Sequence, residues 1–246
     1  SKMRTEATGY GAIFFLRNML EQAGDSMEGK RVLISGSGNV ATHAAEKLLH
    51  LGGKPLTLSD SGGFIHANNG FTQEQINWIK DLKGTRRGRI SEAADEFNDI
   101  SFHANKRPWG VEADCAAPCA TQNEINEHEA KILLENGVNA IAEGANMPCE
   151  QSAVDVFQNA KILFGPAKAV NAGGVGVSGL EMSQNSARIA WDESNLRKLL
   201  EDMMKTIHDS CVQHGKDPDG YVNYLKGSNI AGFVKVADAM LAYGHV

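Results

Sequence analysis

Apolar residues recur along the chain in two alternating patterns, short continuous runs and stripes with helical spacing. Thr5–Ala23 carries a helical stripe that ends at Gly24. Arg31–Ser35 is a short apolar strand, and a helix that follows a glycine turn and runs to about Leu51 leads to a second strand at Pro55–Ser59. This order of strand, glycine turn, helix and strand predicts a βαβ unit.

The same alternation continues to about residue 165. The predicted elements are helix Thr72–Lys83, strand Ala113–Ala117, helix Asn123–Asn136, strand Val138–Glu143, helix Gln151–Asn159 and strand Lys161–Phe164. Thr72 and Gln75 have the spacing of a capping box. Short apolar strands that alternate with helices are typical of a parallel sheet covered on both faces. The predicted fold class is therefore α/β, a Rossmann-type, doubly wound, mostly parallel sheet with helices on both faces.

The pattern changes after Gly165. A loop of small residues is predicted next, with its turn at Asn171–Gly174. From Ser194 the pattern predicts helix to the end of the chain, interrupted near Gly215–Gly220 and Gly227. We therefore expect a boundary near residue 190, with an α/β domain over residues 1–190 and a helical tail over residues 191–246.

Composition narrows the classes of function. The formal net charge of −6 argues against nucleic acid or an anionic membrane as the main partner. The four cysteines and eight histidines lack the spacing of a zinc site or a disulfide framework, so we expect no metal and a reducing cytoplasm. No apolar stretch approaches the ~20 residues of a membrane span, and the polar N-terminal run is not typical of a signal peptide.

The turn after the first strand carries the first chemical signal. Gly36 permits a tight turn, Gly38 lets the backbone approach a pyrophosphate, and the small Ala41 lets helix and strand pack closely. The helix N-terminus offers unpaired N–H groups to the phosphates. An acidic residue, Asp60, stands at the end of the next strand, 24 residues after Gly36. This context predicts a dinucleotide site. Its predicted contact residues are Gly36, Ser37, Gly38, Asn39, Val40 and Asp60.

The choice between NAD and NADP depends on the residues around Asp60. A carboxylate there favours NAD, because it accepts hydrogen bonds from the ribose hydroxyls. The neighbouring Ser61 and a basic run favour NADP, because a 2′-phosphate binds to hydroxyls and cations. The basic run comprises Lys83, Arg86, Arg87 and Arg89. Such a run is also typical of a solvated helix end, so the chemistry favours NADP and leaves NAD open.

Several segments resemble hexameric NADP-dependent glutamate dehydrogenases. They are Arg4–Gly11 (RTEATGYG), Ser35–Ala41 (SGSGNVA), Ala117–Asn123 (APCATQN), Ala142–Pro148 (AEGANMP), Asn171–Asn185 (NAGGVGVSGLEMSQN) and Ser228–Leu241 (SNIAGFVKVADAML). These segments follow one another in the same order as in the family, and the resemblance covers essentially the whole chain. The resemblance implies NADP as cofactor, L-glutamate, 2-oxoglutarate and ammonia as substrates, a cytoplasmic location, and a homo-hexamer for the full-length protein.

The resemblance also assigns cofactor contacts by residue. Thr8 and Asn39 resemble residues that touch the cofactor near its nicotinamide half and its phosphates. Ser61, Lys83 and Arg86 resemble the group that holds the 2′-phosphate. These assignments make residues 1–190 an NADP-binding domain.

Four further residues are assigned to the other end of the site. Asn146 and Asn171 resemble the amides near the nicotinamide ribose and ring. Ser178 resembles a hydroxyl that binds a substrate carboxylate, with Val175 beside the substrate side chain. Without the resemblance, the two asparagines are typical turn residues and Ser178 is a small helix-packing residue.

The resemblance begins where a cofactor domain would begin, because the family's subunit is nearly twice this length. Its N-terminal half carries the catalytic lysines and aspartate, so we expect no catalytic residue here and no activity from this chain alone. The alternatives are an NAD-dependent leucine-, phenylalanine- or valine-type dehydrogenase and a non-catalytic NADP-binding module. In the family, the helical tail packs against the N-terminal half of the subunit. Without that half, the tail's apolar face would be left partly uncovered, at Ile230, Phe233, Val234, Val236, Met240 and Leu241.

Overall fold

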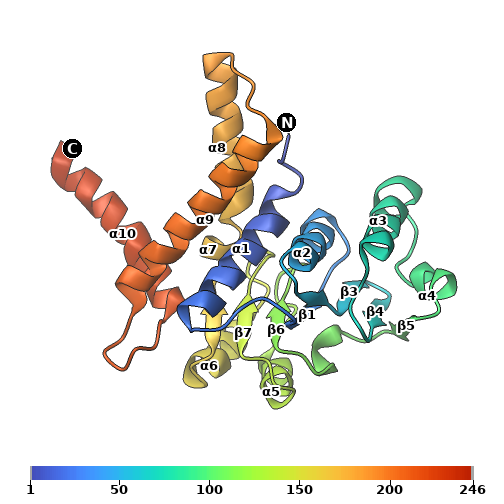
Figure 1. Ribbon diagram of the computed structural model, residues 1–246. Coiled ribbons are helices and arrows are strands. Elements are labelled where there is room, and N and C mark those ends of the chain that lie inside the picture. The colour runs from blue at the N-terminus through green and yellow to red at the C-terminus, as the bar shows by residue number, and fades with distance from the viewer. Residues whose placement is uncertain (1, 245–246) are drawn as a thin grey trace.

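The computed structural model describes residues 2–244 and has a five-stranded parallel sheet at its centre (Figure 1). The strands are β1 (Arg31–Ile34), β2 (Lys54–Pro55), β6 (Cys115–Ala117), β7 (Ala140–Ala142) and β8 (Leu163–Gly165). Their spatial order is β2-β1-β6-β7-β8. Strands β2 and β6 flank β1 on opposite sides, so the strand order reverses at β1. The sheet confirms the predicted α/β fold class.

Helices cover both faces of this sheet because its strands are apolar on both sides. The helices are α1 (Ala7–Gln22) and α2 (Asn39–His50) on one face, and α5 (Glu127–Glu135) and α6 (Gln151–Asn159) on the other. Along β1, Val32 and Ile34 are buried with the first pair, whereas Leu33 is buried with the second. This alternation of side chains makes the sheet the middle layer of three.

A second, antiparallel sheet lies beside the first, and the sequence pattern does not predict it. It comprises β3 (Thr57–Asp60), β4 (Gly63–Ala67) and β5 (Ile100–Ala104). The single strand expected at Pro55–Ser59 divides at Leu56, where β2 ends and β3 begins. At the hairpin, Gly63 has a φ of +145°, and a Cβ there would lie 2.2 Å from the carbonyl oxygen of His103. Only glycine fits this turn.

The helix between β4 and β5 begins as its capping box predicts. In α3 (Gln73–Asp81), the Thr72 hydroxyl accepts the backbone N–H of Gln75 at 3.2 Å, and the Gln75 side-chain oxygen accepts the N–H of Thr72 at 2.9 Å. A π-helical segment η1 (Leu82–Arg86) and a short helix α4 (Glu92–Glu96) follow. The basic run therefore lies on a helix end and the loop that leaves it.

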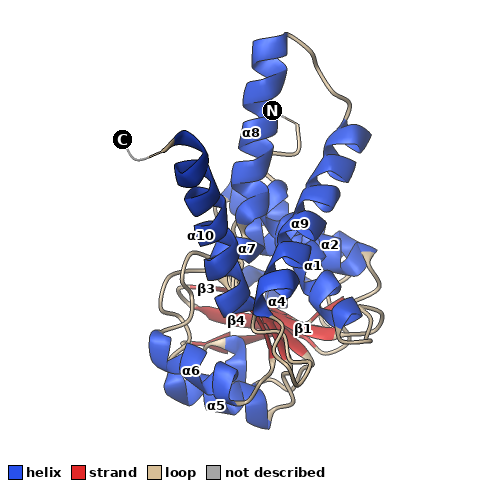
Figure 2. Cartoon of the chain, turned by 90° about the vertical axis from the view of Figure 1, so that its left-hand side faces the viewer, coloured by secondary structure: helices blue, strands red, loops and turns tan. Residues whose placement is uncertain are grey.

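Helices make up the chain after β8. They are α7 (Ala167–Val170), α8 (Ala172–Ala187), α9 (Glu193–Gly215) and α10 (Tyr224–Tyr243). Leu196, Leu200 and Met204 of α9 are buried in the same core as α1. The ends of α8 and α10 project from the body (Figures 1 and 2). Residues on both sides of position 190 thus share one core, and the domain boundary there stays a prediction.

The predicted loop at Asn171–Gly174 is wrong, because Gly173 and Gly174 lie in the first turn of α8. A Cβ at Gly173 would lie 2.4 Å from the carbonyl oxygen of Ala7, and one at Gly174 would lie 2.3 Å from the Oγ1 of Thr8. These glycines therefore allow α8 to cross α1 closely.

Two other boundaries also differ from the pattern. The helix expected from Asn123 begins only at Glu127, because Asn126 caps it by accepting the N–H of Glu129 at 3.0 Å. The expected interruption at Gly227 is absent, because α10 runs unbroken from Tyr224 through that residue. Gly227 is instead a contact point, where a Cβ would lie 2.0 Å from the carbonyl oxygen of Cys211 in α9.

Two glycines of α10 give a matched test of this contact. We expect Gly227→Ala to lower the free energy of unfolding by about 1–3 kcal/mol, because the new methyl group overlaps backbone that cannot move away easily. Gly232→Ala should raise it by up to about 1 kcal/mol, because a Cβ there meets nothing within 4 Å and alanine is the better helix former. Thermal unfolding followed by circular dichroism measures both. Equal shifts in Tm would contradict the close contact.

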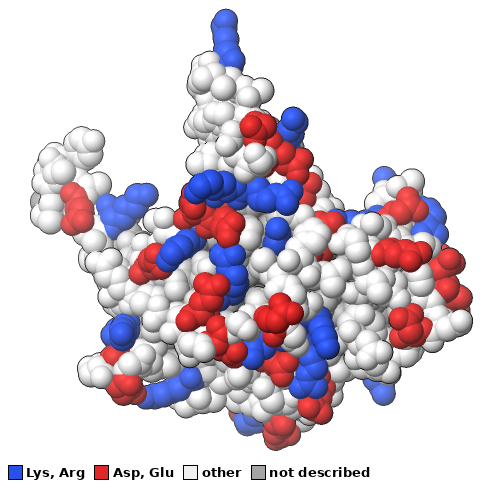
Figure 3. All heavy atoms as spheres, viewed as in Figure 1, with Lys and Arg blue, Asp and Glu red and all other residues white. Residues whose placement is uncertain are grey.

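The apolar face of α10 is partly uncovered, as the sequence predicts. Phe233 is 71% exposed and Leu241 is 82% exposed, whereas Ile230 and Val234 are half-buried. In Figure 3, charges of both signs are mixed over the body, and the projecting ends of α8 and α10 are largely uncharged. Within residues 2–244, no helix combines the length and the hydropathy needed to cross a membrane.

Candidate functional site

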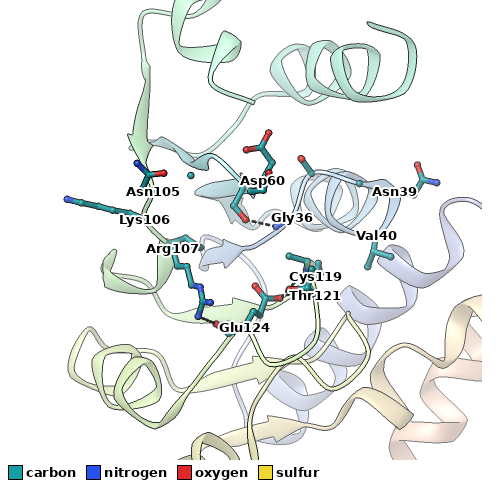
Figure 4. A pocket seen from close by; sticks show the side chains of 17 residues that line it. Gly36, Asn39, Val40, Asp60, Asn105, Lys106, Arg107, Cys119, Thr121 and Glu124 are labelled. Atoms are coloured by element: carbon teal, nitrogen blue, oxygen red, sulfur yellow. Dashed lines mark hydrogen bonds between the residues drawn. The ribbon is translucent and has the colours of Figure 1, made fainter. Parts of the chain in front are cut away.

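A cavity of about 780 Å³ lies where β1, β3 and β6 end (Figure 4). In open parallel sheets, ligands bind at the carboxyl ends of the strands where the strand order reverses, and β1 is that point here. The cavity unites most of the contact residues predicted for the phosphates and the adenosine. They are Gly36, Ser37, Gly38, Asn39, Val40, Asp60 and Ser61.

The two glycines of the turn differ in what surrounds them. Gly36 has a φ of +84°, and a Cβ there would lie 2.9 Å from the carbonyl oxygen of Cys119, so the fold itself requires glycine. Gly38 caps α2 with an ordinary φ of −81°, and a Cβ there would meet nothing within 4 Å. The open space beside Gly38, at the N-terminus of a helix, fits an anionic group such as a pyrophosphate.

The carboxylate of Asp60 is already engaged within the chain. One oxygen accepts the N–H of Gly62 at 2.8 Å, and the other accepts the N–H of Ile90 at 3.1 Å and lies 3.4 Å from Lys83 Nζ. Burial raises the pKa of Asp60, but these hydrogen bonds and the Lys83 charge outweigh it and hold the pKa below its ordinary value. Asp60 is thus a paired anion, which weakens the argument from it for NAD.

No residue of the basic run is among those that line the cavity, but two of its members contact residues that do. Arg89 donates from Nη1 to the Ser61 hydroxyl at 2.8 Å, and Lys83 donates to the carbonyl of Gly88 at 2.9 Å beside Asp60. The sequence names Arg89 within the run but does not single it out. Its position follows from the left-handed residue Arg87, with a φ of +54°, which turns the chain back toward β3.

Arg86 lies elsewhere, on the flank of α3. Its guanidinium stacks over the ring of Trp78, with Cζ 4.4 Å from the centroid, and pairs with Asp81 at 2.9 Å. A cation–π contact and an ion pair hold the side chain there. Its predicted role at the 2′-phosphate would require it to leave Trp78.

Two cations that the sequence analysis missed line the cavity. Lys106 and Arg107 follow β5 and lie on the side of the cavity away from Asn39 (Figure 4). Arg107 donates to the carbonyl of Glu124 at 2.9 Å and pairs with Glu129 at 3.0 Å. The pattern does not predict β5, so it gives no sign that the residues after it reach the cavity.

Three elements meet at Val40, the second residue of α2. A Cβ at Gly9 of α1 would lie 2.5 Å from the Val40 carbonyl oxygen, and one at Gly144 after β7 would lie 3.4 Å from a Val40 methyl group. Thr8 precedes Gly9, so the start of α1 abuts the glycine turn. The region predicted for the nicotinamide half is therefore next to the region predicted for the phosphates.

The two asparagines predicted for the nicotinamide half contact each other. The Asn171 amide nitrogen donates to the Asn146 side-chain oxygen at 2.8 Å. Asn146 lies in the loop after β7, and Asn171 joins α7 to α8. The amide pair thus depends on two separate loops.

The two residues predicted for the substrate lie on α8. Ser178 donates to the carbonyl of Gly174 at 3.1 Å and accepts a hydrogen bond from Arg4 Nε at 2.8 Å. Val175 is 73% exposed. The structure therefore places a hydroxyl, a guanidinium and an apolar side chain on one stretch of surface.

Burial makes the two thiols in and after β6 poor nucleophiles. Burial raises the pKa of the Cys115 thiol to about 12, and burial also raises the pKa of Cys119 at the floor of the cavity. Protonated thiols are poor nucleophiles. Residues 2–244 contain no group of three or more His, Cys, Asp or Glu side chains placed to hold a metal ion.

The sequence matches, over residues 1–244, the family described as Glutamate/Leucine/Phenylalanine/Valine dehydrogenase. It is 56% identical to the NAD(P)-specific glutamate dehydrogenase of Xylanibacter ruminicola, over 99% of this chain and 55% of that protein. It is 49% identical to the NADP-specific enzyme of Haemophilus influenzae, over 99% and 54%. It is 47% identical to the NAD-specific enzyme of Bacteroides fragilis, over 99% and 55%.

A solved structure of similar fold is Plasmodium falciparum glutamate dehydrogenase, with a TM-score of 0.97 and 41% identity over 100% of this chain and 53% of that one. The chain thus spans about half the length of the relatives it matches. The fold, the cavity at the strand-order reversal and the match over nearly every residue all point to the same family. The chain belongs to the glutamate/leucine/phenylalanine/valine dehydrogenase family.

Proposed function

We propose that this chain is the cofactor-binding part of an NADP-dependent glutamate dehydrogenase, which converts L-glutamate reversibly to 2-oxoglutarate and ammonia. The observation that carries the proposal is the cavity at the carboxyl ends of the strands, where the space beside Gly38 is open. NADP, when bound, supplies the hydride chemistry. The residues of this chain bind the cofactor, orient it and exclude water from one side of the cleft.

In this proposal the adenosine ribose lies near Asp60 and its 2′-phosphate lies near Ser61. The Ser61 hydroxyl and the Arg89 guanidinium already form a hydrogen bond at the cavity edge. Lys83 pairs with Asp60, so it offsets the repulsion between that carboxylate and a phosphate. Arg86 would add a third cation if its side chain left Trp78 and paired with the phosphate.

At the other end, Asn146 and Asn171 would hold the nicotinamide ribose and ring, with Thr8 beside the phosphates. Amides suit this task because they donate and accept hydrogen bonds without adding charge beside a ring that changes charge during hydride transfer. Ser178 and Arg4 would hold one carboxylate of the substrate, with Val175 against its methylene groups.

The experiment that tests the proposal is calorimetric titration of the chain with NADP and with NAD. We expect NADP to bind at least ~10-fold more tightly, a difference of about 1.4 kcal/mol. Lys83→Glu and Arg89→Gln should each remove most of that difference, because each removes a cation from the 2′-phosphate.

Arg197→Gln is the control, because it removes a guanidinium from α9 that pairs with Glu193 on the surface. It should leave the ratio of the two affinities unchanged. Arg86→Gln reports whether Arg86 leaves Trp78 for the phosphate. Equal or tighter binding of NAD by the unaltered chain would overturn the NADP assignment and favour an NAD-dependent relative, as the carboxylate of Asp60 would suggest.

A further inference from the structure

A buried carboxylate is hydrogen-bonded to both segments that carry Asn146 and Asn171. Glu143 follows β7 directly and is only 5% exposed. One of its oxygens accepts the backbone N–H of Cys149 at 3.2 Å, and the other accepts the backbone N–H of Ala167 at 2.8 Å. The first N–H lies three residues after Asn146, in the loop that follows β7. The second belongs to Ala167, the first residue of α7, and Asn171 follows the other end of this short helix. One side chain therefore fastens the two segments that carry the amides, the loop after β7 and helix α7.

The placement of a carboxylate here has a cost. Burial raises the pKa of Glu143, although the hydrogen bonds from Ala167 and Cys149 and the charge of Lys168 oppose that rise. An apolar side chain would fill the same space without the desolvation penalty. The carboxylate offers instead two acceptor oxygens, which join the loop after β7 to the start of helix α7.

We infer that Glu143 is a positioning residue, which fixes the Asn146–Asn171 amide pair in the geometry that receives the nicotinamide half of the cofactor. The inference rests on the proposed function. The 2.8 Å hydrogen bond between the two amides joins the same two segments that Glu143 fastens. If either segment moves by about 1 Å, this bond is lost and the amides no longer present a single surface.

The adenosine half of the site has a buried carboxylate of its own, in a loop whose Glu124 N–H also donates to the carbonyl of Pro148 at 2.7 Å. Glu124 is also buried, and its carboxylate accepts the N–H of Ala120 at 3.0 Å beside the glycine turn. It lies on the opposite side of Gly36 from Asp60 (Figure 4). The two hydrogen bonds of Glu143 go to Cys149 and Ala167, and neither residue lines the cavity of the adenosine half. A change at Glu143 should therefore weaken the nicotinamide half more than the adenosine half.

The test is titration of the Glu143→Gln variant with NADP and with adenosine 2′,5′-bisphosphate, which lacks the nicotinamide half. Glutamine keeps the size of the side chain but has one acceptor oxygen, so its NH₂ group faces one of the two N–H donors. We expect the NADP affinity of the variant to fall ~10-fold, and its affinity for the bisphosphate to stay within about twofold of that of the unaltered chain. The variant should therefore prefer NADP over the bisphosphate less strongly than the unaltered chain does.

Glu46→Gln is the matched control, because it removes a partly buried carboxylate that binds Tyr10 and Lys80 away from the amide pair. It should leave the ratio of the two affinities unchanged. Glu143→Asp is a second variant in case glutamine prevents folding, and it should act in the same direction, since a shorter carboxylate cannot reach both segments. Adding Asn171→Ala to Glu143→Gln should lower NADP affinity little further, since both act through one pair.

Proportional loss of both affinities would mean that Glu143 only supports the fold, and no loss of either would overturn the inference. Equal binding of NADP and the bisphosphate by the unaltered chain would also overturn it, because the amide pair would then add no affinity. A chain that binds neither ligand would contradict the proposed function itself, which separates the two failures.

Discussion

We expect the 246-residue chain by itself to bind NADP but to give no measurable glutamate-dependent formation of NADPH. Oxidation of an amino acid needs an acid–base group beside the α-carbon and cations for both carboxylates. The described residues that we assign to this end are the amides of Asn146 and Asn171, the Ser178 hydroxyl and the Arg4 guanidinium. They can hold one end of a substrate, but none is an acid–base group near neutral pH. Removal of a catalytic group costs orders of magnitude in rate, because such groups act as a unit.

A spectrophotometric assay of NADPH formation measures this, with the full-length glutamate dehydrogenase of Xylanibacter ruminicola as positive control. Turnover within ~100-fold of that enzyme would mean that acid–base groups lie in this chain after all. Binding of NADP without turnover would support the division of labour, and restored turnover on addition of the remaining half of such an enzyme would support it further.

The second large effect is expected at the glycine turn. Gly38→Val should abolish binding of NADP, because its side chain would occupy the space that the pyrophosphate must enter. The fold should remain, because Gly38 has an ordinary φ and its surroundings are open. Gly36→Ala should instead destabilise the fold. Its φ of +84° and its 2.9 Å approach to the Cys119 carbonyl make any side chain a strain on the fold, worth about 1–3 kcal/mol.

Circular dichroism melts and calorimetric titration, run on both variants, separate the two roles. Gly38→Val should keep the Tm of the unaltered chain and lose its heat of binding. Gly36→Ala should melt at a lower temperature. Normal NADP binding by a folded Gly38→Val variant would show that the pyrophosphate lies elsewhere.

The parallel sheet is predictable from the sequence because its strands are continuous apolar runs between helices with caps. The antiparallel sheet is not, because its third strand, β5, is separated from β4 in the chain by α3, η1 and α4. Pairing between distant segments leaves no local pattern. The cations that follow β5, Lys106 and Arg107, are missed for the same reason.

Small residues show a second limit of prediction from sequence. Glycine at Asn171–Gly174 and at Gly227 suggests a turn, since local propensity disfavours it in a helix. The structure uses Gly173 and Gly227 for contact between helices, which depends on the partner helix and not on the neighbouring residues. At the site, the sequence identifies a basic run but does not tell that Arg89 reaches Ser61 whereas Arg86 stacks on Trp78.

The antiparallel sheet has an evolutionary consequence. Beyond Ser59, the residues that we propose for the ribose and its 2′-phosphate, Asp60, Ser61 and the loop with Arg89, belong to the antiparallel sheet and its connections and not to the parallel sheet. Substitutions there would alter charge and hydroxyls without changing Gly36 or the strands of the parallel sheet. Under this proposal, selection could exchange one dinucleotide for the other through a few such substitutions, which would fit relatives called NAD(P)-, NADP- and NAD-specific at 56%, 49% and 47% identity to this one chain.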